Sequence, residues 1–393
     1  MKPAVQISRV LVGVLFIFSG LIKANDPLGL SYKMQEFFDL WGLSRFDDYT
    51  LFMSVLMNAF EIIAGFALLV GWRIKLFSWL LLILIVFFTF LTGYAYLSGK
   101  FKSCGCFGDC IPITPGTSFV KDLILLVLIA FLFWQRDKIK PIFGPKVSMA
   151  TMFGFTVFAF GIQWYTLSYL PVADCLAFKK GNNIKEKMQI PPGARPDSFA
   201  IRFVYEKGGK QFEFASTELP SDLATYKFVS RVDKLIRKGN AEPAIRGFVL
   251  SGITDEDSTQ IVLSQPAALI IFCEDFSVPV SKWEKSFAEV YEKVKTKNIP
   301  VYMVTGRPDE AAKSITGKSF SGIQVLKCDI TAIRTAARTN PCIYLLKNGT
   351  IEGKWSYHRM GAVKSEIEKL SALPAASTEI PDPVMIPDTL NHD

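Results

Sequence analysis

The sequence predicts a multi-span α-helical membrane bundle followed by a soluble α/β domain. Half of the 393 residues are hydrophobic, 33 are Phe and only 20% are charged, which is too apolar for a soluble protein of this length. The apolar residues gather in five long runs before residue 171, and the composition then changes to that of a soluble domain. The expected parts are residues 1–135 (a four-span bundle), 136–170 (a basic cytoplasmic loop and a fifth span), 171–254 (a linker region with a β-hairpin and a helix), 255–373 (an α/β domain) and 374–393 (a disordered tail).

Each of the five apolar runs is close to the length that crosses the hydrocarbon core, which takes ~20 residues. The first run is not followed by a small-x-small cleavage site, so we interpret it as a retained signal anchor. Five runs of this length argue against the alternative, core helices of a soluble protein. The runs are residues 7–22, 51–71, 74–97, 119–134 and 149–170.

Basic residues near the span ends predict the orientation in the membrane. Lys2, the link that holds Arg73 and Lys75, and four basic residues between the fourth and fifth spans lie on one side. This excess places the N-terminus in the cytoplasm of a bacterial inner membrane, and an odd number of spans places everything after residue 170 outside. The net charge of +8 reflects these flanks and does not indicate nucleic-acid binding.

The soluble region alternates strand and helix patterns. Apolar runs of five to seven residues predict buried strands, and the longer amphipathic stretches between them predict helices. A Gly-Gly turn after Lys207 predicts a hairpin. The expected elements are strands 198–205 and 211–215, a helix 223–238, a strand 267–273, a helix 283–295, a strand 301–305, a helix 309–315, a strand 323–328, a helix 331–338, strands 342–346 and 350–355, and a helix 361–373.

Several chemistries are excluded by what the sequence lacks. His358 and His392 are the two histidines, and neither lies in an apolar run, which excludes bis-His haem, His-rich zinc sites and a buried His base. The glycine spacing of nucleotide-binding loops is missing as well. Thiol chemistry remains, because the chain has seven cysteines.

Three of these cysteines, Cys104, Cys106 and Cys110, lie in one loop between the third and fourth spans. Glycines on both sides of Cys106 permit a tight turn that brings sulfurs together. Three thiols in an oxidising compartment do not all stay reduced without help, so a redox loop that exchanges electrons with a partner or a quinone is one interpretation. A structural disulfide with one thiol left over is another. A metal site is disfavoured, because Cys₃ would need a fourth ligand.

The loop and its flanks resemble a known family. The sequence "SCGCFGD" before a span that opens "FVKDLILLVLIAF" is similar to the MauE (methylamine-utilisation) branch of DoxX-like membrane proteins. The first span, "RVLVGVLFIFSGLIKANDP", and the second, "NAFEIIAGFALLVG", resemble the same family, and the match covers roughly residues 5–135. The resemblance implies a four-helix membrane bundle linked to envelope thiol chemistry. It also implies a disulfide-rich client and a thioredoxin-like redox partner.

Glu61 stands near the middle of the second span. An ionisable group at this depth is costly and by default indicates function, such as a proton relay. The alternative is a protonated Glu61 that bonds a polar side chain of a neighbouring helix, for which the candidates are Asn58, Thr89 and Thr92.

Charged residues also lie at the outer ends of two spans. Lys23 and Asp26 end the first span, and Lys121 and Asp122 begin the fourth. They could pair across the bundle close to the cysteines, and a cation there would favour a thiolate. Snorkelling to the interface explains the two lysines equally well.

The soluble region resembles a thioredoxin-like fold of the TlpA or peroxiredoxin type over roughly residues 255–373. The sequences "LIIFCEDFSVPVSKW" and "TNPCIYLLKNGTIEG" carry the resemblance, and the second implies that Pro341 is a cis-proline. The positions of the family's Cys-x-x-Cys read Ser277 to Val280 here. Without a thiolate and a resolving thiol this domain is not expected to be a catalyst. The remaining role is to bind a peptide along the cis-proline surface, formed by Ser277, Pro279, Pro341 and Cys342.

Three further cysteines have open roles. Cys273 and Cys342 lie on elements that are neighbours in this fold, so they could pair, although buried and inert thiols are the favoured interpretation. Cys175 follows the fifth span and could pair with a loop thiol.

The sequence supports two functions. The first is a membrane protein of envelope thiol–disulfide chemistry, in which the cysteine loop is at most a redox relay and the thioredoxin-like domain docks a client or partner. The second is a non-enzymatic scaffold whose loop cysteines form a structural disulfide. A transporter-like bundle that uses Glu61 is the weakest alternative.

Overall fold

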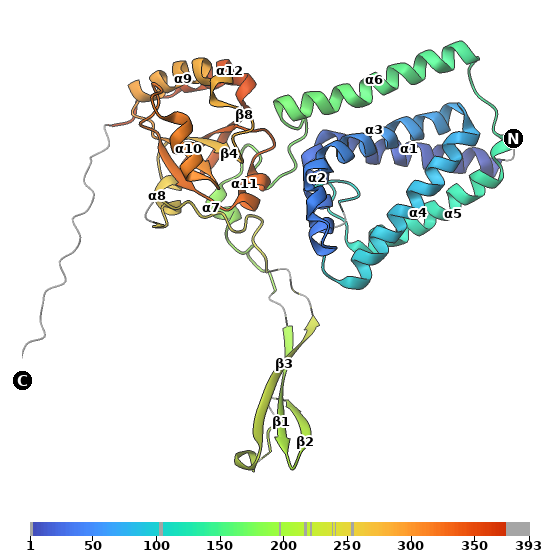
Figure 1. The fold of residues 1–393 in the computed structure, drawn as a ribbon, viewed down its shortest axis with the longest axis horizontal. Coiled ribbons are helices and arrows are strands. Elements are labelled where there is room, and N and C mark those ends of the chain that lie inside the picture. Colours follow the sequence, from blue (N-terminus) through green and yellow to red (C-terminus); the bar gives the residue numbers. More distant parts are fainter. Residues whose placement is uncertain are drawn as a thin grey trace, which may run out of the picture.

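The computed structural model describes residues 3–101, 105–195, 198–215, 218–220, 222–237, 239, 241–252 and 255–374. Figure 1 shows three parts: a bundle of long helices, an α/β domain beside one end of the bundle, and a narrow β-arm that projects from the α/β domain. Cys104 and residues 375–393 of the expected tail lie outside the described residues.

The five predicted spans are all helices that are long and apolar enough to cross a membrane. Their outer faces expose large apolar side chains, as contact with lipid requires; Ile83 and Val127, for example, are 60% and 68% exposed. The chain is therefore a multi-pass membrane protein. The spans are α1 (Pro3–Asn25), α3 (Thr50–Val70), α4 (Ile74–Ser98), α5 (Pro115–Trp134) and α6 (Pro145–Tyr169).

A further helix, α2 (Pro27–Leu40), lies across the end of the bundle that faces the α/β domain (Figure 1). The Asp26 side chain caps it by accepting a hydrogen bond from the Gly29 backbone N–H at 3.0 Å, and Pro27 opens its first turn. The sequence analysis did not predict this helix, because charged residues interrupt its apolar positions. A 3₁₀ segment, η1 (Ser44–Tyr49), joins α2 to α3.

Glycines let α1 and α3 approach closely. A Cβ on Gly13 would lie 2.6 Å from the Leu69 side chain, and a Cβ on Gly65 would lie 2.7 Å from the Gly13 carbonyl oxygen. Small residues at such a crossing are typical of membrane helix pairs. The same crossing brings Lys23 of α1 against Glu61 of α3.

The α/β domain is built on a five-stranded sheet in the order β6-β5-β4-β7-β8. Strands β4, β5 and β6 run parallel, and β7 and β8 are antiparallel to their neighbours. One face packs against α9, α10 and α12, and the other against α11 and shorter segments. This mixed sheet with helices on both faces confirms the thioredoxin-like prediction. The strands are β4 (Ala268–Cys273), β5 (Val301–Thr305), β6 (Gln324–Lys327), β7 (Cys342–Lys347) and β8 (Thr350–Ser356).

The predicted helices and strands of this domain are present, with ends shifted by a few residues. The bond between Asn340 and Pro341 is cis, as the resemblance implied. Short helices that the sequence did not reveal also contact the domain. These two unpredicted helices are α7 (Ile184–Lys187) and α8 (Thr259–Leu263). The predicted helices are α9 (Glu284–Thr296), α10 (Pro308–Ile315), α11 (Ile330–Ala336) and α12 (Met360–Lys369).

The β-arm is a three-stranded antiparallel sheet in the order β2-β1-β3. The predicted hairpin is β1 (Ser198–Lys207) with β2 (Lys210–Ala215). The helix predicted over residues 223–238 was wrong: this segment forms a 3₁₀ turn and then β3 (Lys227–Arg237), which pairs with β1. Phe228 and Val232 stay exposed, so a helix here would have no core to pack against, whereas a strand completes the hydrogen bonds of β1.

Candidate functional site

The cysteine loop is joined to the start of the soluble region by a disulfide between Cys110 and Cys175, whose Cα atoms lie 4.8 Å apart. A pairing of Cys175 with a loop thiol was one of the predicted possibilities. Among the described cysteines, Cys106 remains the free thiol of the loop. Cys104 lies outside the described residues, so its partner is not defined by the structure.

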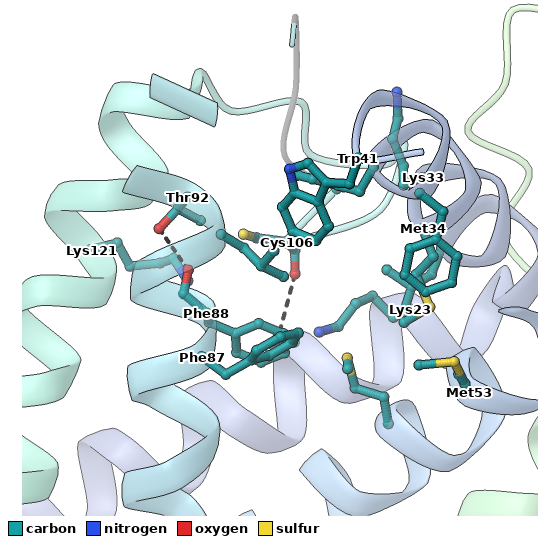
Figure 2. A pocket seen from close by; sticks show the side chains of 17 residues that line it. Lys23, Lys33, Met34, Trp41, Met53, Phe87, Phe88, Thr92, Cys106 and Lys121 are labelled. Atoms are coloured by element: carbon teal, nitrogen blue, oxygen red, sulfur yellow. Dashed lines mark hydrogen bonds between the residues drawn. The ribbon is translucent and has the colours of Figure 1, made fainter. Parts of the chain in front are cut away.

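Cys106 borders a pocket of about 100 Å³ that opens between α1, α2, α3, α4 and the cysteine loop. Figure 2 shows Trp41, Phe87 and Phe88 around this space, with Cys106 on one wall. The Ser19 hydroxyl of α1 donates a hydrogen bond of 3.1 Å to the Cys106 carbonyl oxygen and ties the loop to the bundle. The pocket is lined mainly by aromatic, Met and Leu side chains, with Lys23, Lys33 and Lys121 as its charged members.

Two ion pairs lie inside the bundle next to this pocket. Lys23 pairs with Glu61, and both side chains are buried, at 3% and 1% exposure. Lys121 pairs with Asp122 at 2.6 Å, and Asp122 also accepts a hydrogen bond of 3.0 Å from the Thr92 hydroxyl. Buried charges in a membrane protein are costly unless paired, so these groups mark a candidate functional site.

The pairing of these charges differs from what the sequence suggested. Glu61 accepts a hydrogen bond from Lys23, which was not among its predicted partners. One of those predicted partners, Thr92, donates its hydroxyl hydrogen bond to Asp122. Lys23 is buried, which contradicts snorkelling to the interface. Lys23 and Asp26 were expected to pair across the bundle with Lys121 and Asp122, but Asp26 contacts the soluble domain and Lys121 pairs with its neighbour Asp122.

The charges of the bundle act on the Cys106 thiol. Burial raises the pKa of Cys106, because the thiolate loses hydration. The positive charge of Lys121 lowers the pKa of Cys106, and that of Lys23 lowers it to a smaller extent. The negative charge of Asp122 raises this pKa further. Cys106 is therefore held mainly as a neutral thiol, with a cation close enough to stabilise the thiolate when it forms.

The α/β domain contacts the bundle through two arginines that follow β6. The Arg338 guanidinium is 4% exposed and donates through Nε to the Asp26 carboxylate at 2.7 and 2.9 Å. Its Nη2 lies 3.0 Å from the carboxylate of Asp109, the residue before Cys110. Arg334 bonds Glu274 at 2.7 Å, and Glu274 accepts a hydrogen bond of 3.0 Å from the Tyr32 hydroxyl of α2. One arginine of the soluble domain thus holds both the α1–α2 corner and the cysteine loop.

The degenerate thioredoxin-like site faces this junction. Ser277 and Pro279 are exposed, whereas Pro341 and Cys342 are buried. The Asn340 side chain donates a hydrogen bond of 2.9 Å to the Asp275 carbonyl oxygen, which closes the cis-proline loop against the end of β4. Of the four predicted surface residues, two are therefore accessible in this arrangement.

Cys273 and Cys342 are both free and fully buried at the facing ends of β4 and β7. The possible Cys273–Cys342 disulfide is not formed, which agrees with the favoured interpretation of inert thiols. Burial raises the pKa of Cys273 to about 12 and that of Cys342 to about 11. At neutral pH both are protonated and unreactive.

We expect iodoacetamide to leave Cys273 and Cys342 unmodified in the folded protein at pH 8, because thiols with these pKa values are roughly 0.1% thiolate or less. Alkylation should rise only near pH 11, or at pH 8 once denaturant unfolds the domain and restores ordinary thiol pKa values. Mass spectrometry of tryptic peptides measures both. Rapid alkylation at pH 8, or a native Cys273–Cys342 disulfide, would contradict the prediction.

Two functional residues escaped the sequence analysis. Arg338 is one of 44 basic residues and carries no local signal, and its acidic partners lie 312 and 229 positions away. Lys33 lines the pocket because of α2, which the sequence did not predict. Among the described residues, no group of three or more His, Cys, Asp or Glu side chains is placed to hold a metal ion.

Comparisons with known proteins agree with this geometry. The family model of the methylamine utilisation protein MauE matches residues 1–135, which hold the first four spans and the cysteine loop. A domain of unknown function (DUF8463) matches residues 199–238, the strands of the β-arm. Protein TlpB of Flavobacterium psychrophilum is 29% identical over 133 residues, which cover 33% of this chain and 36% of TlpB, so the chain matches about a third of that relative's length. No solved structure matches the chain significantly. Residues 1–135 are therefore a MauE-like membrane region, which this chain joins to a thioredoxin-like domain.

Proposed function

We propose that this protein is a thiol–disulfide relay of the bacterial inner membrane that exchanges electrons with an extracytoplasmic protein dithiol through Cys104 and Cys106. The observation that carries the proposal is the position of Cys106. It is a free loop thiol on the wall of an aromatic pocket, with the Lys121 ammonium acting on it and a second ion pair behind it. The MauE resemblance adds a link to envelope thiol chemistry.

The exchange needs two loop sulfurs. A thiolate of the partner attacks one sulfur of a Cys104–Cys106 disulfide, a mixed disulfide forms, and the partner's second thiolate displaces it. The partner leaves with a disulfide and the loop with two thiols, so electrons and protons balance. Lys121 stabilises the Cys106 thiolate as the leaving group, since it is the strongest influence that favours the charged form.

The Cys110–Cys175 disulfide has a different role in this proposal. It pins the loop to the segment after α6 and leaves Cys106 free to react. A disulfide that joins two segments at the same end of the bundle supports an oxidising compartment at that end. This agrees with the proposed topology, in which the N-terminus is cytoplasmic and the loop and soluble domain are outside.

The thioredoxin-like domain is a docking element in this proposal, because its Cys-x-x-Cys positions hold no cysteine. Ser277 and Pro279 are exposed next to Glu274, which contacts α2. A client that binds these residues would lie close to the loop that oxidises or reduces it. The arginine contacts to Asp26 and Asp109 also favour the alternative function, a non-enzymatic scaffold whose soluble domain is fixed to the bundle.

Redox trapping separates the two functions. Membranes equilibrated across a series of glutathione redox potentials are alkylated with a membrane-impermeant maleimide, and the labelled cysteines are mapped by mass spectrometry. We expect Cys106 to change from alkylated to protected within the range of cellular redox potentials, while Cys110 and Cys175 stay oxidised until strong reduction.

A Cys106 that is alkylated equally at every potential would reject the relay and leave the scaffold. An absence of external labelling, even after reduction and denaturation, would show that the proposed topology is inverted.

A further inference from the structure

The pocket beside Cys106 is open to the lipid side of the bundle. Met53 of α3 and Phe87 of α4 both line it and are 39% and 43% exposed on the outer surface of the helices. Figure 2 places these two side chains around the same space as Cys106. A ligand that is dissolved in the bilayer therefore has a route to the thiol without crossing water.

The pocket walls suit a flat ring. Trp41, Phe88 and Phe37 contribute aromatic surfaces, and Met34 and Met57 add flexible side chains that adapt to a bound group. The enclosed space of about 100 Å³ is smaller than most cofactor sites, so it would hold the ring of a ligand and leave a longer tail outside. Phospholipid tails would also fit the apolar walls, but they have no hydrogen-bond acceptor for the lysine side chains that line the pocket.

Those charged groups are hydrogen-bond donors. Lys23 lies 5.0 Å from the centre of the Phe88 ring, and Lys121 lies 5.2 Å from the centre of the Phe107 ring. Both lysines line the pocket, although each also pairs with a carboxylate. Two ammonium groups beside aromatic walls match a ligand that is a ring with acceptor oxygens.

A second, smaller cavity continues from the first and shares Ser19, Phe88 and Lys121 with it. It is lined by Glu61, whose Oε2 atom is buried and has no hydrogen-bond partner among the described residues. An unpartnered oxygen at this depth is costly, which indicates a proton or a polar group that the described residues do not supply.

We propose that this pocket binds a quinone, which serves as the electron acceptor of the loop dithiol; this role rests on the proposed function, whereas the binding does not. The ring lies between the aromatic walls with a carbonyl oxygen towards the lysines, and the isoprenoid tail leaves past Met53 and Phe87 into the bilayer. When the loop dithiol becomes a disulfide it releases two electrons and two protons, and these convert the quinone to a hydroquinone.

The test uses the full-length protein in quinone-free nanodiscs of phosphatidylethanolamine and phosphatidylglycerol, with decylubiquinone as the probe. Saturable quenching of tryptophan fluorescence measures binding, and a Trp41→Phe variant should lose much of the signal. Leu91→Trp fills the pocket and should weaken binding at least about tenfold, the effect of one overpacked side chain. Ile83→Trp, on the lipid face of the same helix, should leave binding unchanged.

Met57→Trp narrows the pocket from α3 and provides a second variant should Leu91→Trp fail to fold. Non-saturable quenching, or equal affinity in all variants, would overturn the quinone site and show that only lipid occupies the pocket. Cys106→Ser separates the two proposals, since it should still bind decylubiquinone while it loses redox exchange. Quinone binding without any redox change at Cys106 would reject the relay alone, and thiol exchange without quinone binding would reject the quinone site alone.

Discussion

Replacing Cys106 with Ser should abolish the exchange of disulfides between this protein and a partner dithiol. A serine hydroxyl neither forms a disulfide nor leaves as a stable anion at neutral pH, so the loop keeps one thiol at most from the Cys-Gly-Cys sequence. The rate of oxidation of a reduced client peptide in membrane vesicles should fall to that of vesicles without the protein. The fold should survive, because Cys106 lies in a loop and takes no part in the structural disulfide.

Cys328→Ser is the matched control for this variant. Cys328 is also a free thiol, but it is buried at the end of β6 and its pKa is raised to about 12 by burial. Its loss should leave the exchange rate unchanged. Equal rates in wild type, Cys106→Ser and Cys328→Ser would remove thiol chemistry from the loop and leave the scaffold as the function.

The sequence was sufficient where structure follows from local pattern. The spans are long apolar runs, and β4, β5 and β7 are short runs that are buried on both faces, so composition and length predict them. Ser277 to Val280 mark the missing dithiol of the soluble domain without any coordinates. The loop cysteines also stood out in the sequence, and Cys175 was a predicted partner, but the sequence did not indicate which loop thiol pairs with it.

The rest depends on contacts between distant segments. The partner of Glu61 is Lys23, 38 residues away, because glycines let α1 and α3 cross closely; the sequence offered nearer hydroxyl and amide groups instead. Strand β3 was mistaken for a helix because its pairing with β1, rather than a local apolar face, decides its conformation. One wall of the pocket is formed by α2, and the mixed polar and apolar composition of α2 makes this helix look like a loop in the sequence.

Arg338 lies at the junction between the two parts of the chain. Its guanidinium is buried over the Tyr32 ring, with the ring centre 5.5 Å away, and pairs with the carboxylates of Asp26 and Asp109. The Asp26 side chain is 11% exposed, so water would hydrate its carboxylate poorly if the arginine were removed. The same arginine therefore docks the soluble domain and positions the cysteine loop.

Arg338→Leu should weaken docking of the soluble domain by on the order of 3 kcal/mol, about 100-fold, since it leaves the largely buried Asp26 carboxylate without a cation and with the Gly29 backbone N–H as its remaining donor. The value lies at the low end for buried pairs because Asp109 is 42% exposed. Hydrogen exchange should become faster in α2, α11 and residues 105–110, without faster exchange in β4 and β5. Client oxidation should slow as well, because the loop loses its anchor at Asp109.

Arg307→Leu is the matched control, since Arg307 pairs with Glu310 at 3.5 Å on the surface of the same domain and both are about half exposed. Such pairs contribute about 0–1 kcal/mol, so hydrogen exchange at the junction should not change.

Combining Arg338→Leu with Asp26→Asn should recover part of the docking, because the unpaired buried charge is then gone. If Arg338→Leu behaves like Arg307→Leu, the soluble domain is not held by this contact, and the loop is positioned by other contacts, which include the Cys110–Cys175 disulfide, the Ser19 hydrogen bond and the packing of Phe107 on Phe18.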